Sequence, residues 1–133
     1  MKALEVIDAF SEREFLDREI SSCEFEDMAC SLARLRERDQ LNLLPLLMIY
    51  ILNRQNDGRA TNYGEMIVFR LMPQPDGWKN LIDDMSGAEV NATLKWLICA
   101  KNFPFSVNCM DELRLAIELF NERSGSGKMG CKS

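Results

Sequence analysis

The chain contains no histidine, and this absence excludes more functional classes than any other feature of the sequence. Histidine supplies the general base of Ser-His-Asp and Cys-His active sites, two ligands of the HExxH zinc site, and the usual proton shuttle near neutral pH. Structural zinc would have to be held by cysteines alone, and the five cysteines include no CxxC pair. The sequence therefore indicates no catalytic residue, no cofactor-binding residue and no metal ligand.

Long apolar runs are also missing. The longest, residues 43–52, has ten positions including Pro45, whereas a membrane helix needs about 18 or more. Glu5 and Asp8 interrupt the stretch where the apolar part of a signal peptide would lie. Cysteines that are odd in number and not closely paired are typical of reduced thiols, not of a secreted disulfide scaffold. We therefore expect a cytoplasmic protein that does not contact a membrane.

The residues that are present are typical of one globular domain. Apolar residues make up 47% and charged residues 28% of the 133 positions, which is enough for a single hydrophobic core. The formal charge of −5 is unevenly distributed, because residues 1–39 hold six Lys and Arg against eleven Asp and Glu. An acidic surface repels phosphate backbones, so we expect no nucleic-acid partner.

Helix start signals recur along the chain. Ser and Glu stand three residues apart, as in a capping box, at positions 11 and 14, 21 and 24, and 86 and 89. Behind the second pair, apolar residues recur at helical spacing between positions 25 and 35. Behind the third pair, the apolar face runs from Val90 to Ile98, with Trp96 on its flank. Each of these segments is predicted to be a helix.

Three further features bear on where the helices begin and on which residues form the core. Pro45 suits the first turn of a helix, where its missing N–H costs nothing, so we expect a central helix to begin there. Residues 62–72 have helical cap spacing but strand-like composition at residues 66–69. We favour a helix, because a lone strand would have nothing to pair with. Trp78 and Trp96 are both expected at the edge of the core.

These signals predict an all-α fold, a single compact bundle of about six to seven helices. A short strand at residues 65–72 is the alternative to a helix there. The helical domain is expected over residues 1–123. Residues 124–133 are rich in Gly and Ser, a composition typical of a flexible C-terminal tail.

Acidic residues of the first third of the chain are the candidate binding residues. Adjacent carboxylates diverge by about 100° on a helix, so the acidic pairs of this sequence do not converge on a metal. Acidic surfaces instead accelerate association with basic proteins. The candidate protein-binding residues are Glu12, Glu14, Asp17, Glu19, Glu26 and Asp27.

Five landmarks follow one another along the chain. They are Ile7-Asp8-Ala9-Phe10, Leu43 to Met48 with its Leu-Pro step, Leu71-Met72-Pro73, the predicted helix at 86–97 and the apolar segment 113–120. Their order resembles that of small uncharacterised bacterial proteins built around a helix with a Leu-Pro step. The resemblance implies a helical fold, and it implies no site because that family has no assigned activity.

Three functional hypotheses follow. The first is a small acidic cytosolic module that binds another protein of basic character, for example an immunity protein that neutralises a toxin. The second is a phage or bacterial adaptor or regulatory protein that forms homo-oligomers. The third is an enzyme that uses carboxylates or a lysine in place of histidine. The lack of a catalytic pattern favours the first.

Overall fold

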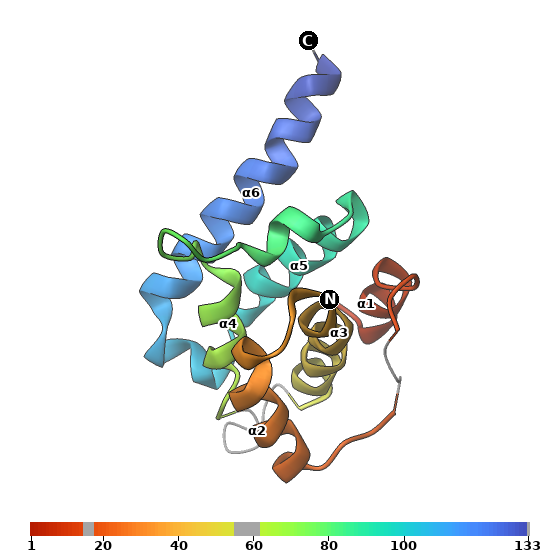
Figure 1. Ribbon diagram of the computed structural model, residues 1–133, viewed down its shortest axis with the longest axis vertical. Helices are drawn as coiled ribbons and strands as arrows, with labels where there is room; N and C mark the ends of the chain where they lie inside the picture. The colour runs from red at the N-terminus through yellow and green to blue at the C-terminus, as the bar shows by residue number, and fades with distance from the viewer. Residues whose placement is uncertain (15–17, 55–61, 133) are drawn as a thin grey trace.

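The computed structural model describes residues 1–14, 18–54 and 62–132, with side chains up to residue 124. Regular secondary structure in these ranges is entirely helical (Figure 1). The α-helices are α1 (Ala3–Ala9), α2 (Ser22–Ser31), α3 (Glu37–Asn53), α4 (Glu65–Leu71), α5 (Gly87–Ala100) and α6 (Met110–Lys132). Short 3-10 helices are η1 (Leu32–Arg34), η2 (Leu81–Asp84) and η3 (Pro104–Asn108). The all-α prediction is confirmed, and residues 65–71 are a helix, not a strand.

The central element is α3, and α1 and α2 pack against it. Every residue of α3 from Leu44 to Leu52 is buried. The prediction that this helix begins at Pro45 is wrong, because it begins at Glu37 and the proline lies in its interior. The turn before the proline buries Leu41 and Leu44 in the core, and this packing outweighs the roughly 3 kcal/mol that an interior proline costs a helix.

Two of the three predicted capping boxes are confirmed. Ser21 Oγ accepts a hydrogen bond from the Glu24 N–H at 3.1 Å, and the Glu24 carboxylate accepts one from the Ser21 N–H. Ser86 and Glu89 make the same reciprocal pair at the start of α5. No helix begins at Ser11, because residues 10–12 form a turn.

The second half of the fold is a pair of packed helices, α5 and α6. Ser124 Oγ lies 2.9 Å from Asn91 Oδ1, and Arg123 pairs with Asp83 at 2.7 Å. The late part of α6 therefore lies beside the early part of α5, so the two helices run antiparallel. The backbone of α6 continues to Lys132 and extends beyond the other helices (Figure 1). The predicted flexibility of residues 124–133 stays a prediction, because most of their side chains lie outside the described part.

The two tryptophans occupy opposite environments. Trp96 is fully buried, and its indole N–H donates to the carbonyl of Met48 in α3. Trp78 is 66% exposed. Both predictions of a position at the core's edge are therefore wrong. The buried face of α5 is rotated from the predicted one, since Trp96 points inward and Ile98 is 48% exposed.

None of the described helices is long and apolar enough to span a membrane.

The cysteines differ in burial, which predicts a difference in reactivity. Cys23 and Cys30 are exposed, whereas Cys109 is buried. Burial, with smaller contributions from Glu65 and Glu112, raises the pKa of Cys109 to about 11. The thiolate is the nucleophile that attacks a disulfide reagent, so at pH 8 such a reagent should label Cys23 and Cys30 in the native protein and Cys109 only after unfolding. Mass-spectrometric mapping checks this, and native labelling of Cys109 at the rate of Cys23 would contradict the packing around η3.

Candidate functional site

An open cleft of about 680 Å³ lies between the turn that follows α1 and the start of α5. Residues 8–13 form one wall, and residues 83–89 form the other. We call it the acidic cleft. Its lining residues are Asp8, Ala9, Ser11, Glu12, Arg13, Asp83, Asp84, Met85, Ser86, Ala88 and Glu89.

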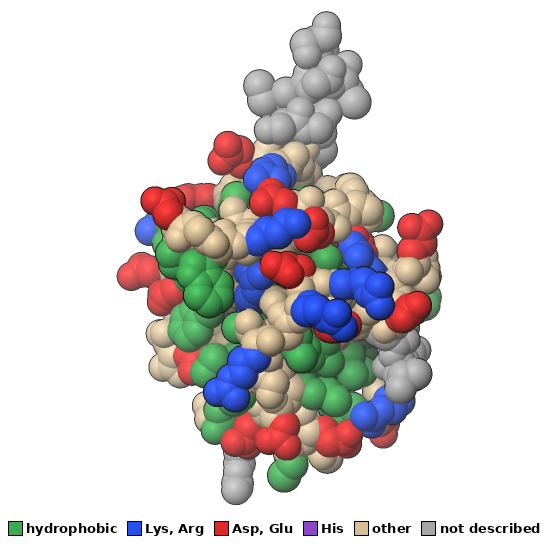
Figure 2. Space-filling model, viewed as in Figure 1, with side chains coloured by type: hydrophobic (Ala, Val, Ile, Leu, Met, Phe, Trp, Pro, Cys, Tyr) green, Lys and Arg blue, Asp and Glu red, His purple; other side chains and the backbone are tan. Residues whose placement is uncertain are grey.

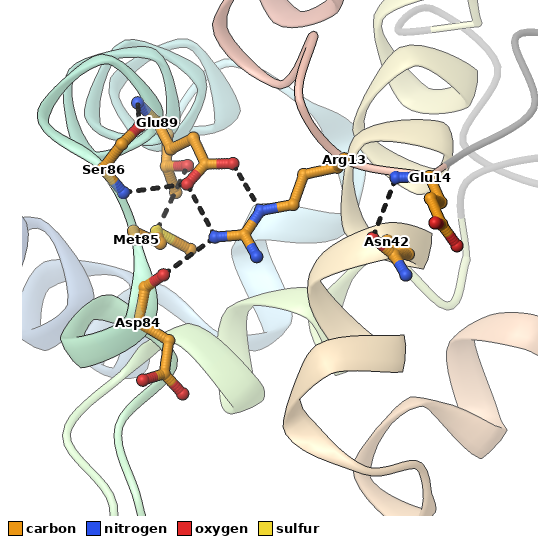
Figure 3. A network of polar contacts seen from close by, with 8 residues as sticks. Arg13, Glu14, Asn42, Asp84, Met85, Ser86 and Glu89 are labelled. Carbon is orange, nitrogen blue, oxygen red and sulfur yellow. Dashed lines mark hydrogen bonds and ion pairs between the residues drawn. The ribbon is translucent and has the colours of Figure 1, made fainter.

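An ion pair joins the two walls. Arg13 Nε donates to Glu89 Oε2 at 2.7 Å, and Arg13 Nη2 donates to Glu89 Oε1 at 2.9 Å (Figure 3). The same Nη2 also donates to the carbonyl oxygen of Asp84 at 2.8 Å. Glu89 Oε1 in addition accepts a hydrogen bond from the Ser86 N–H at 2.8 Å. A bidentate pair of this kind fixes orientation as well as distance, so the two walls are held in one geometry.

The environment of Glu89 keeps it ionised. Its side chain is 4% exposed, against 22% for that of Arg13. Burial has the largest single effect on the pKa of Glu89 and raises it, but the hydrogen bonds from Arg13 and from the Ser86 N–H together outweigh burial and leave the pKa below its ordinary 4.5. The hydrogen bond to Glu89 in turn raises the pKa of Arg13. Glu89 therefore carries no proton near neutral pH and cannot serve there as a general acid.

The rim of the acidic cleft is more negative on the α1 side. Asp8 and Glu12 are exposed and form no ion pair among the described residues. On the other side, Asp83 pairs with Arg123, and Asp84 pairs with Lys79 at 3.0 Å. Across the described part of the chain, no three Asp, Glu or Cys side chains converge where they could hold a metal ion. The described rim thus offers exposed negative charge without a chelating geometry.

The structure places one of the six predicted binding residues in this cleft, namely Glu12. Glu14 is exposed just beyond it, and its backbone N–H donates to Asn42 Oδ1 of α3 at 3.1 Å (Figure 3). Asp17 lies outside the described residues. Glu19 is exposed and lines a separate cavity of about 140 Å³.

The other two predicted residues, Glu26 and Asp27, are exposed on α2. Glu26 accepts a hydrogen bond from the Tyr63 hydroxyl, and this contact raises the pKa of Tyr63. Neither residue lines the acidic cleft. The five described members of the predicted set are therefore spread over the turn after α1, the segment before α2 and α2 itself.

Sequence reasoning missed most of the cleft. Asp83 and Asp84 were visible as an acidic pair just before the capping box of Ser86 and Glu89. No pattern in the sequence indicates the contact between Arg13 and Glu89, because the two residues stand 76 positions apart.

Comparison of the chain with models of known protein families, with curated proteins and with solved structures found no match. The resemblance to small bacterial helical proteins thus stays a prediction, and the acidic cleft is the feature from which a function can be argued.

Proposed function

We propose that this protein is a binding module for a basic protein partner, which docks at the acidic cleft. The observation that carries the proposal is two exposed carboxylates on the rim of an open cleft, Asp8 and Glu12, which form no ion pair with any residue that the structure describes. Arg13 is the one cation among the cleft's described lining residues, and its charge is neutralised by the ion pair with Glu89. Such a surface attracts cationic groups and repels anionic ones, which speeds correct association and disfavours wrong partners.

The rigidity of the cleft supports the same proposal. The bidentate contact between Arg13 and Glu89 fixes both walls before any partner arrives. A preformed surface loses less conformational freedom on binding, so more of the interaction energy appears as affinity. An immunity protein that neutralises a basic toxin is one form this module could take. Homo-oligomerisation and catalysis without histidine stay predictions.

Charge reversal at the rim tests the proposal. We expect the variant Asp8→Lys/Glu12→Lys to bind a synthetic nona-arginine peptide about tenfold more weakly than the unaltered protein, because like charges then face each other across the interface. Surface plasmon resonance at low salt gives both the association rate and the affinity.

The matched control is Asp111→Lys/Glu122→Lys, which reverses two exposed carboxylates on α6. Both double variants change the formal net charge from −5 to −1, so a difference between them reports where the charge lies. Equal losses in the two variants would show that the peptide senses only overall charge, and would overturn the proposal.

A further inference from the structure

The segment between α4 and η2, residues 72–80, displays an exposed aromatic side chain. Trp78 is 66% exposed and is the largest of the exposed apolar side chains. Phe69, in the last turn of α4, is 37% exposed. Figure 2 shows hydrophobic side chains gathering at the left of the face in view, over α4 and the segment after it. We call residues 72–80 the Trp78 loop.

A tight turn and a glutamine hold the Trp78 loop in shape. The Trp78 N–H donates to the carbonyl of Pro75 at 3.0 Å, and Gly77 between them has φ +88°, a value that favours glycine. The Gln74 side-chain amide donates to the carbonyls of Phe69 and Met72 at 2.9 and 2.8 Å. These hydrogen bonds hold the loop against the end of α4.

The C-terminal end of the Trp78 loop contacts the wall of the acidic cleft. The buried Arg70 donates to the carbonyl of Lys79 at 3.1 Å and to the side chain of Gln40. Lys79 Nζ pairs with the carboxylate of Asp84 at 3.0 Å, and Asp84 lines the cleft. The exposed indole is thus presented by a fixed loop that leads directly into one wall of the cleft.

The charges around Trp78 favour a cationic occupant. Asp76 is exposed in the same turn. The one cation of the Trp78 loop, Lys79, is engaged by Asp84 and also lies within the field of Glu37, and both raise its pKa. An indole face attracts Arg and Lys side chains within about 6 Å of the ring centre. Tryptophan is also among the residues that most often dominate a protein interface.

We propose that Trp78 is the aromatic anchor of the partner interface: an Arg or Lys side chain of a basic segment stacks on its indole, while neighbouring cations of that segment reach the acidic cleft. This inference rests on the proposed function, because it extends the same interface from the cleft to the Trp78 loop. The occupant is a basic segment of a partner protein, chosen because the exposed Asp76 lies in the same turn as Trp78 and the loop continues to Asp84 in the wall of the acidic cleft.

The two indole groups of the chain provide the test, because one is exposed and the other buried. In a ¹⁵N–¹H correlation spectrum of the whole protein, titration with nona-arginine should shift the indole cross-peak of Trp78 and leave that of Trp96 in place. Trp78→Ala should weaken peptide binding about fivefold. Val107→Ala, which shortens an exposed apolar side chain on η3, should leave the affinity unchanged. Nona-glutamate should shift neither cross-peak.

The outcomes separate this inference from the proposed function. If the peptide binds and Asp8→Lys/Glu12→Lys weakens it, but Trp78→Ala binds equally well, Trp78 is not the anchor and the proposed function stands. A moved Trp78 cross-peak without a loss of affinity in Trp78→Ala leads to the same conclusion. If nona-arginine does not bind, or binds regardless of the charge at positions 8 and 12, the proposed function fails and the inference fails with it.

Discussion

Replacing Trp96 by alanine should lower the free energy of unfolding by about 4 kcal/mol, a loss typical of removing a buried tryptophan. The side chain is fully buried, and its indole N–H donates to the Met48 carbonyl at 3.2 Å. Its ring lies 6.3 Å from that of Phe103 and 6.4 Å from that of Phe105, measured between centroids. Alanine would leave a cavity where α3, α5 and η3 meet. Urea denaturation followed by far-ultraviolet circular dichroism measures the loss.

The same change at Trp78 is the matched control. Trp78→Ala removes an identical side chain from an exposed loop, so its free energy of unfolding should stay within about 0.5 kcal/mol of the unaltered protein. This result would also show that the binding experiment on Trp78→Ala uses a folded protein. If the two variants lost similar stability, the assignment of Trp96 to the core and Trp78 to the surface would be wrong.

Local signals predicted the parts of the fold whose causes are local. The capping boxes at the starts of α2 and α5 could be read from the sequence because their partners stand three residues apart and satisfy each other's backbone N–H groups. The helix at 65–71 is predicted for a tertiary reason, because the chain offers no other predicted strand with which a strand there could pair. The capping boxes thus needed information from one segment alone, whereas the helix at 65–71 also needed the elements predicted for the rest of the chain.

Features decided by packing were predicted wrongly or not at all. A local rule predicts a helix start at Pro45, whereas α3 begins two turns earlier, at Glu37, because Leu41 and Leu44 are buried in the core. The rotation of α5 that buries Trp96 depends on the Met48 carbonyl, which lies 48 residues away. The ion pair that shapes the cleft joins residues 13 and 89. No periodicity or spacing encodes such distant contacts, so most of the site was invisible to sequence reasoning.

Removing Arg13 should have the second large effect. Arg13→Ala leaves the carboxylate of Glu89 buried without its cation, and we expect a loss of about 3 kcal/mol in unfolding free energy at pH 7, at the low end for a broken buried pair because Arg13 is partly exposed. The double variant Arg13→Ala/Glu89→Gln should recover much of this loss. Glutamine carries no charge, and its carbonyl oxygen can still accept from the Ser86 N–H.

The pH dependence of Arg13→Ala distinguishes a lost ion pair from lost packing. In the unaltered protein the pKa of Glu89 lies below its ordinary value of 4.5. The ionised carboxylate therefore adds to the free energy of unfolding above pH 4.5, and this stabilisation is lost as the pH falls below 4.5 and the carboxylate takes up a proton. Without Arg13, burial should raise the pKa of Glu89, so the folded variant gains relative stability as pH falls and the carboxylate takes up a proton. The difference in unfolding free energy should therefore shrink between pH 7 and pH 4. A difference that stays constant over this range would mean that Arg13 holds the cleft through its packing and not through its charge.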